Sequence, residues 1–182
     1  EWRRVLATNL DGAFLAVKHG ARAMGKEGGA IVLIGSASGT RPAAGAAAYS
    51  TSKAGVAMLA RTAAKECRDG GLAIRINVVS PAGVKTPMWS RMPFFRDLVV
   101  KLGSEDAAYE SLTAAGGGVF VDPHEIAESI CFLASDAARH VTGVELLVDG
   151  GGHERSGGPV DVDGDVDSGP FLEVVERLAD LL

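Results

Sequence analysis

The sequence is poor in several features that would point directly to a class of function. Its 182 residues include two cysteines, four histidines and only 5% aromatic residues. Cys67 and Cys131 stand far apart, which predicts free, buried thiols in a reducing compartment rather than a disulfide framework. The histidines lack the spacing of metal ligands, so no metal site is predicted.

Charge and hydropathy disfavour two kinds of partner. The formal net charge is −5 and no stripe of basic residues is present, so nucleic acid is not an expected partner. No apolar run approaches the roughly 18 residues of a membrane span. The first residues also lack the apolar core of a signal peptide. Together these features predict a cytoplasmic protein without a membrane partner.

Acidic residues gather near the end of the sequence. Residues 153–182 hold eight acidic and two basic residues, whereas residues 1–152 hold 15 and 16. We therefore predict a catalytic domain over 1–152, followed by an acidic Gly/Asp-rich linker and a short amphipathic helix within 153–182. A calcium loop starting at Asp161 is disfavoured, because its sixth and twelfth positions are not the required glycine and glutamate.

Helices and strands are predicted to alternate along the chain. Apolar spacing and short buried runs predict helices over 2–24 and 48–68, and strands over 30–35, 72–80 and 143–151. A further helix is predicted to start at Asp122, with Pro123 in its first turn and Glu125 completing a capping box. This alternation predicts an α/β fold with a parallel sheet covered on both faces.

Tyr49 and Lys53 lie four residues apart at the start of the second predicted helix. Positions i and i+4 share a helix face, so the phenol and the ammonium can meet. A nearby ammonium favours the phenolate, which suits a tyrosine to act as a general acid/base. The same spacing also occurs in ordinary exposed helix pairs, so the other motifs of the chain must decide between the two interpretations.

The polar segments that follow two predicted strands support a shared site. Residues 35–39 follow one strand, and the segment starting at Pro81 follows the next. The carboxyl ends of parallel strands meet at one edge of the sheet, where open α/β folds bind their ligands. Ser36, Tyr49 and the residues after Pro81 are therefore predicted to converge in one crevice.

Several motifs in order carry a family resemblance over residues 1–151. They are "ATNLDGAF", "IGSASG", "AAYSTSKAG", "INVVSPAGVKTPM" and the closing "TGVELLVDGG". The sequence resembles the C-terminal half of a short-chain dehydrogenase/reductase, which implies half of a Rossmann-like, doubly wound sheet. The resemblance implies a catalytic tetrad of Asn9, Ser36, Tyr49 and Lys53.

The resemblance also implies roles. Hydride would pass between a secondary alcohol or ketone and the nicotinamide of NAD or NADP. Tyr49 would transfer the proton, Ser36 would bind the substrate oxygen, Lys53 would hold the ribose, and Asn9 would hold a water through its backbone carbonyl. The implied cofactor contacts are Tyr49, Lys53, Pro81, Gly83, Val84 and Thr86. Taken singly, Ser36 also fits a loop serine that caps its own turn, and Asn9 a solvated helix residue.

Part of the family pattern is absent from this sequence. It has no glycine-rich phosphate turn and no segment that selects between NAD and NADP, and it begins with Glu1. We expect the natural enzyme to be longer. The alternative is a non-catalytic chain that serves as an assembly or interaction module. By analogy with the family, the helices over 2–24 and 48–68 imply a homo-oligomer, either a dimer or a tetramer.

Residues 87–120 fall where the family carries its substrate-covering segment. The apolar residues of this predicted lid are Met88, Trp89, Met92, Phe94, Phe95, Leu98, Val99 and Leu102. They predict an apolar, alicyclic alcohol or ketone as substrate, with residues 116–118 as a possible hinge. The alternative is that these side chains pack under the lid and touch no substrate.

Overall fold

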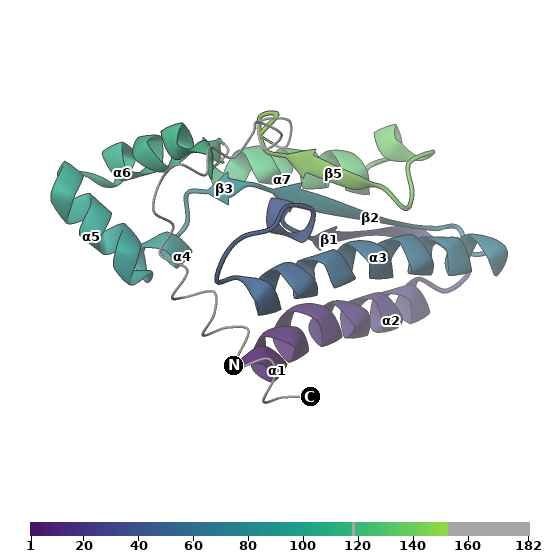
Figure 1. Ribbon diagram of the computed structural model, residues 1–182. Coiled ribbons are helices and arrows are strands. Elements are labelled where there is room, and N and C mark those ends of the chain that lie inside the picture. The colour runs from purple at the N-terminus through teal and green to yellow at the C-terminus, as the bar shows by residue number, and fades with distance from the viewer. Residues whose placement is uncertain (118, 153–182) are drawn as a thin grey trace.

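The computed structural model describes residues 1–117 and 119–152, and the linker and helix predicted within 153–182 lie outside this part. Its centre is a parallel sheet with strand order β1-β2-β5 (Figure 1). The strands are β1 (Gly29–Ile34), β2 (Ile74–Pro81) and β5 (Glu145–Val148). Each strand overlaps a predicted strand: β1 and β2 differ from the prediction by one or two residues at their ends, and β5 lies inside the predicted range. The strands pair in parallel, so the predicted α/β class with a parallel sheet is confirmed.

One face of the sheet is covered by α2 (Gly12–Met24) and α3 (Ala47–Asp69) (Figure 1). The predicted helix over 2–24 is helical throughout, but it consists of α1 (Trp2–Leu6), a π-helical turn η1 (Ala7–Asp11) and α2. Small and β-branched side chains of α3 pack on the sheet, and they allow the helix to approach β2 closely. The buried members of this core include Val56, Ala60, Ala64, Ile74, Ile76 and Val78.

The other face of the sheet is covered by α7 (Pro123–Ala134) (Figure 1). The predicted capping box is present: the Asp122 backbone N–H donates to Glu125 Oε2 at 2.7 Å. Leu133 packs with Val79 in a second core on this face, beside the short turn η4 (Asp136–Ala138).

The two cysteines have different environments. Cys67 is buried in α3, as predicted, whereas Cys131 lies exposed on α7. The prediction of burial is therefore wrong for Cys131. The physical reason is its position on α7, which buries Ile126 and Leu133 on one side and leaves Cys131 on the other.

The predicted lid is a small helical unit beyond the carboxyl end of the sheet (Figure 1). Its elements are α4 (Pro87–Ser90), α5 (Pro93–Leu102), α6 (Glu105–Leu112) and a π-helical turn η3 (Thr113–Gly117). Two short strands, β3 (Gly83–Val84) and β4 (Phe120–Val121), pair in parallel where the chain leaves and re-enters the main domain. Within the described residues, no helix is both long and apolar enough to cross a bilayer.

Candidate active site

Ser36 lies directly after β1, at the edge of the sheet where the strands end. It is buried and forms the N-cap of a 3-10 turn, η2 (Ala37–Gly39), in which the Ser38 backbone N–H donates to Ser36 Oγ at 3.2 Å. Ser36 therefore caps its own turn, and this bond fixes the position of its hydroxyl. The hydroxyl proton remains available to a ligand, because Ser36 acts as acceptor in that bond.

Tyr49 and Lys53 lie in the first turns of α3, and the structure brings them together. Lys53 Nζ lies 5.7 Å from the centroid of the Tyr49 ring and donates to the carbonyl oxygen of Ile34 at 2.9 Å. The lysine therefore reaches back to the last residue of β1. Burial lowers the pKa of Lys53, because partial removal of water disfavours the ammonium.

A close approach between η2 and α3 brings the turn that Ser36 caps against the backbone of Lys53. A Cβ atom at Gly39 would lie 2.9 Å from both the carbonyl carbon of Lys53 and the backbone nitrogen of Ala54. Only glycine allows the two backbones to come this close. Among the described residues, no hydrogen bond joins the Tyr49 hydroxyl to Ser36 or Lys53, so the structure brings these three side chains to one edge without linking them all.

Asn9 contacts α3 through Ser52, which is not among the predicted site residues. Asn9 lies in the π-helical turn η1, and its Nδ2 donates to Ser52 Oγ at 3.0 Å. Ser52 in turn donates to the backbone carbonyl of Tyr49 at 2.6 Å and is completely buried. The Asn9 side chain is therefore bound to Ser52, not to Lys53. The sequence signal for this contact is a serine between Tyr49 and Lys53, in a helix where most of the nearby residues are apolar.

The predicted cofactor contacts after β2 lie at the same edge of the sheet as Ser36. Pro81 ends β2, Gly83 and Val84 form β3, and Thr86 is the N-cap of α4. The Val84 carbonyl accepts a hydrogen bond from Trp89 Nε1 at 3.0 Å, so this carbonyl binds the lid. Their role in binding a cofactor stays a prediction.

The predicted lid residues separate into two groups. Phe95 is completely buried, with its ring centroid 4.8 Å from that of Tyr109, so it packs under the lid. Trp89 and Met92 pack against the lid core, which is formed by Phe95, Ala108 and Tyr109. Met88 and Phe94 are 49% and 51% exposed, and they are the lid residues with the most free apolar surface among the five predicted contacts. Contact of any of them with substrate stays a prediction.

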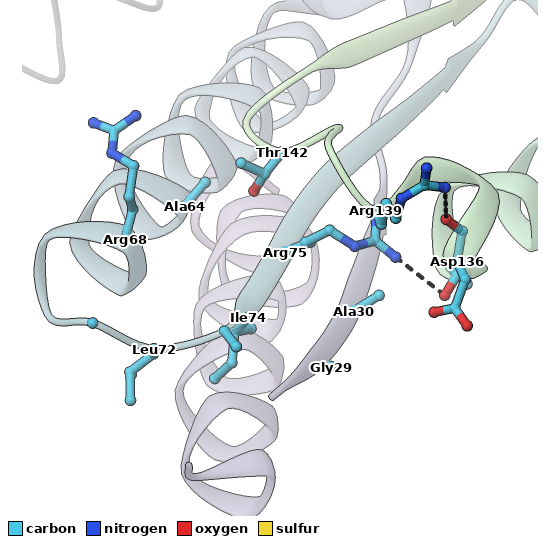
Figure 2. A pocket seen from close by; sticks show the side chains of 13 residues that line it. Gly29, Ala30, Ala64, Arg68, Leu72, Ile74, Arg75, Asp136, Arg139 and Thr142 are labelled. Atoms are coloured by element: carbon cyan, nitrogen blue, oxygen red, sulfur yellow. Dashed lines mark hydrogen bonds between the residues drawn. The ribbon is translucent and has the colours of Figure 1, made fainter. Parts of the chain in front are cut away.

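A hollow of about 540 Å³ lies among the starts of β1 and β2 and the segment after α7 (Figure 2). It is lined by Gly29 and Ile74, the first residues of β1 and β2, and is therefore at the opposite edge of the sheet from Ser36. Figure 2 shows Arg75 extended toward the segment that carries Asp136 and Arg139. Its guanidinium donates to backbone carbonyls there, so we interpret this arginine as structural. The described residues hold no cluster that could bind a metal ion.

Comparison with known proteins defines the class. A family model described as enoyl-(acyl carrier protein) reductase matches residues 1–153. The chain belongs to the short-chain dehydrogenase/reductase family.

Named relatives include dehydrogenases. The chain is 40% identical over 151 residues to cis-4-hydroxycyclohexanecarboxylate dehydrogenase of Sinomonas cyclohexanicum, a match that covers 82% of this chain and 55% of that one. It is 34% identical over 149 residues to 3-beta-hydroxysteroid dehydrogenase of Comamonas testosteroni, covering 82% and 56%. It is 38% identical over 156 residues to momilactone A synthase of Oryza sativa, covering 83% and 53%. The chain thus spans about half the length of these curated relatives.

Proposed function

We propose that this chain is the catalytic part of an NAD(P)-dependent oxidoreductase that interconverts a secondary alcohol and a ketone. The observation that carries the proposal is the arrangement of Tyr49 and Lys53. The ammonium lies beside the phenol ring and donates to the Ile34 carbonyl at the end of β1, two residues before the buried Ser36. Family membership and relatives named as dehydrogenases support the same activity.

The chain's own residues have complementary tasks in this proposal. NAD(P), when bound, supplies or accepts the hydride. Tyr49 transfers the proton at the substrate oxygen, with the ammonium of Lys53 beside its ring. Ser36 donates its free hydroxyl proton to the same oxygen and holds it while negative charge develops.

Lys53 also fits a second task, which is to hold the cofactor. An ammonium carries three N–H donors, and the Ile34 carbonyl accepts only one of them in the structure. The remaining donors suit hydroxyl groups such as those of the nicotinamide ribose. The proposed contacts with the rest of the nicotinamide half are Pro81, Gly83, Val84 and Thr86. The choice between NAD and NADP stays open.

We propose an apolar, alicyclic substrate. Met88 and Phe94 present apolar surface on the lid, at the carboxyl edge of the sheet. Relatives whose names refer to a hydroxycyclohexanecarboxylate and to a hydroxysteroid support a ring-shaped alcohol of this kind. Hydrophobic contact with the lid would exclude water from the reacting atoms.

The test is turnover by the protein expressed from its complete reading frame, with a panel of alicyclic alcohols and both cofactors. Tyr49→Phe removes the proton-transferring hydroxyl and is expected to lower kcat by about 10²–10⁴-fold. Tyr109→Phe is the matched control, because Tyr109 is the other tyrosine of the chain and is buried in the lid core. Full turnover by Tyr49→Phe would rule out the proposed mechanism.

We also propose a homo-oligomer for the complete protein. Trp2, Phe14 and Leu15 on α1 and α2, and Met58 on α3, are exposed large apolar side chains. Covering them would remove apolar surface from water. Light scattering after size-exclusion chromatography tests this proposal, and Phe14→Glu is expected to shift the protein toward monomer. A monomeric wild-type protein at micromolar concentration contradicts it.

A further inference from the structure

We propose that Ser52 is a positioning residue for the Tyr49–Lys53 pair, because it joins the first turn of α3 to the π-helical turn that carries Asn9. This inference rests on the proposed function, since it concerns the same site. Ser52 is a polar residue with no exposed surface, on the face of α3 where Val56 and Ala60 are also buried. Apolar packing alone would favour alanine there, because burial of a hydroxyl costs free energy unless hydrogen bonds offset it.

The two hydrogen bonds of Ser52 have a defined direction. A serine hydroxyl has one proton, and Ser52 gives it to the backbone carbonyl of Tyr49 at 2.6 Å. Its oxygen must therefore accept the second bond, which comes from Asn9 Nδ2 at 3.0 Å. The chain of bonds runs from the Asn9 amide through the Ser52 hydroxyl to the Tyr49 carbonyl. It connects side chains 43 positions apart in the sequence to the backbone of the proposed acid/base.

Close packing on both sides of α3 restricts the position of the first turns of this helix. On the side of η1, a Cβ atom at Gly55 would lie 3.0 Å from both Cδ atoms of Leu10. On the side of η2, Gly39 already allows backbone contact with Lys53. The start of α3 therefore lies between two turns that touch it closely, and Ser52 supplies its hydrogen bond to η1.

The position of the turn controls the environment of Lys53. Lys53 follows Ser52 directly, and its Nζ reaches the Ile34 carbonyl only if α3 stays close to the end of β1. Without the Ser52 hydroxyl, the Asn9 amide would lose its partner and the turn would lose its link to η1. Water would then gain access to Lys53, whose pKa is lowered by burial.

Ser52→Ala and the matched control Ser50→Ala test the proposal in the protein expressed from its complete reading frame. Ser50 lies in the same turn, and its buried hydroxyl has no partner among the described residues. Ser52→Ala is expected to lower kcat about tenfold and to leave KM within about twofold, because small displacements of a catalytic group slow the chemistry. Ser50→Ala is expected to keep wild-type kcat. Equal kcat values for the two variants would overturn the proposal.

The pKa of Lys53 gives a readout that does not require turnover. Competitive labelling of lysines with acetic anhydride across alkaline pH, read by mass spectrometry, measures it in the chain as it stands. In Ser52→Ala the pKa of Lys53 is expected to rise toward its ordinary value, whereas Ser50→Ala leaves it unchanged. An unchanged pKa in Ser52→Ala contradicts the proposal. If Tyr49→Phe retains turnover but the Lys53 pKa rises as expected, the proposed function fails and the positioning by Ser52 stands.

Two further variants separate positioning from loss of folding. Ser52→Cys keeps a side chain of similar size but a weaker donor and acceptor, so its kcat and Lys53 pKa are expected between those of the wild type and Ser52→Ala. The double variant Asn9→Ala/Ser52→Ala is expected to lose no more kcat than the more damaged single variant, because both changes remove the same bond. Fully additive losses would show that the two side chains act independently and would overturn the proposal.

Discussion

At the scale of single residues, Lys53 shows how the site balances charge against burial. Its ammonium is partly removed from water, which lowers its pKa, and it keeps one hydrogen bond to the Ile34 carbonyl. No carboxylate forms an ion pair with it among the described residues. A lysine with a lowered pKa and a phenol beside it is a combination expected in an acid/base site rather than on an ordinary helix surface.

This burial predicts a specific pH dependence of stability. The folded protein disfavours protonated Lys53, so below the lowered pKa the residue costs stability. As pH rises from that lowered pKa to the ordinary value of about 10.4, the unfolded chain binds more protons than the folded one and the cost disappears. The difference in unfolding free energy between wild type and Lys53→Met is therefore expected to increase in favour of the wild type over this range. Urea denaturation at several alkaline pH values measures it, and a constant difference contradicts it.

The cysteines allow a second prediction at this scale. Burial, with a smaller contribution from Glu66, raises the pKa of Cys67, whereas Cys131 is exposed. Because the thiolate is the reactive form, Cys131 is expected to react with a thiol reagent such as DTNB well before Cys67. Cys131→Ser should then leave only slow labelling in the folded protein and fast labelling in urea. Rapid labelling of folded Cys131→Ser would show that Cys67 is accessible.

The sequence predicts some of these residues better than others. Tyr49 and Lys53 could be paired in advance, because helical spacing alone brings positions i and i+4 together. Ser52 could not be identified as the partner of Asn9, because that contact depends on how η1 packs against α3. The amphipathic pattern of α7 also does not determine which of its small residues face solvent, and the predicted burial of Cys131 is wrong for this reason.

At the scale of elements, long helices and strands follow from local sequence, whereas deviations within them follow from packing. The helix over 48–68 differs from α3 by one residue at each end. The π-helical turn within 2–24 was not predicted, because a change from i+4 to i+5 hydrogen bonding leaves almost no trace in the apolar spacing. It includes Asn9, a member of the proposed tetrad, and such turns are frequent at functional sites.

The lid gives a prediction that distinguishes packing from substrate contact. Phe95→Ala removes a completely buried ring that contacts Trp89 and Tyr109, and it is expected to cost about 3–5 kcal/mol of lid stability. Phe94→Ala is the adjacent control: half of Phe94 is exposed and its ring meets Trp89 edge-to-face, so its loss should cost only about 1 kcal/mol. Amide hydrogen exchange over residues 87–112 measures the difference, and similar protection in both variants would contradict it.

The same pair of variants tests the substrate side of the lid. Phe94→Ala is expected to lower kcat/KM for bulky alicyclic ketones relative to small ones, because it removes apolar contact surface. Trp89→Ala extends the comparison to a residue that also binds the Val84 carbonyl. An unchanged ratio for bulky and small ketones in both variants would rule out substrate contact by this part of the lid.

At the scale of the whole molecule, the alternation of helices and strands predicts a parallel sheet covered on both faces, and the structure confirms it. The pairing of β3 with β4 could not be predicted, because strands of two residues have no periodicity to detect. This pairing depends on Gly83, where a Cβ atom would lie 2.6 Å from the Phe120 ring. It connects the lid to the main domain at the edge of the sheet that carries Ser36.

At the opposite edge of the sheet, one arginine binds several backbone carbonyls. The Arg75 side chain, on β2, donates to the carbonyls of Leu133, Ala134, Ser135 and Val141. These carbonyls belong to the end of α7, where the helix leaves acceptors unpaired, and to the segment that leads into β5. One planar guanidinium therefore connects the sheet, its covering helix and the return to the last strand.

Replacement of Arg75 tests how much its hydrogen bonds contribute to the free energy of unfolding. Arg75→Lys keeps the charge but loses the planar set of donors, and it is expected to lower the unfolding free energy by about 2–3 kcal/mol because several carbonyls lose a charged partner. Arg68→Lys, in the same hollow but exposed and paired with Asp69 at the surface, is the control and should change it by no more than about 0.5 kcal/mol. Urea denaturation measures both variants. Equal stability would mean that water satisfies those carbonyls as well as Arg75 does, and that α7 is held to the sheet by its apolar face alone.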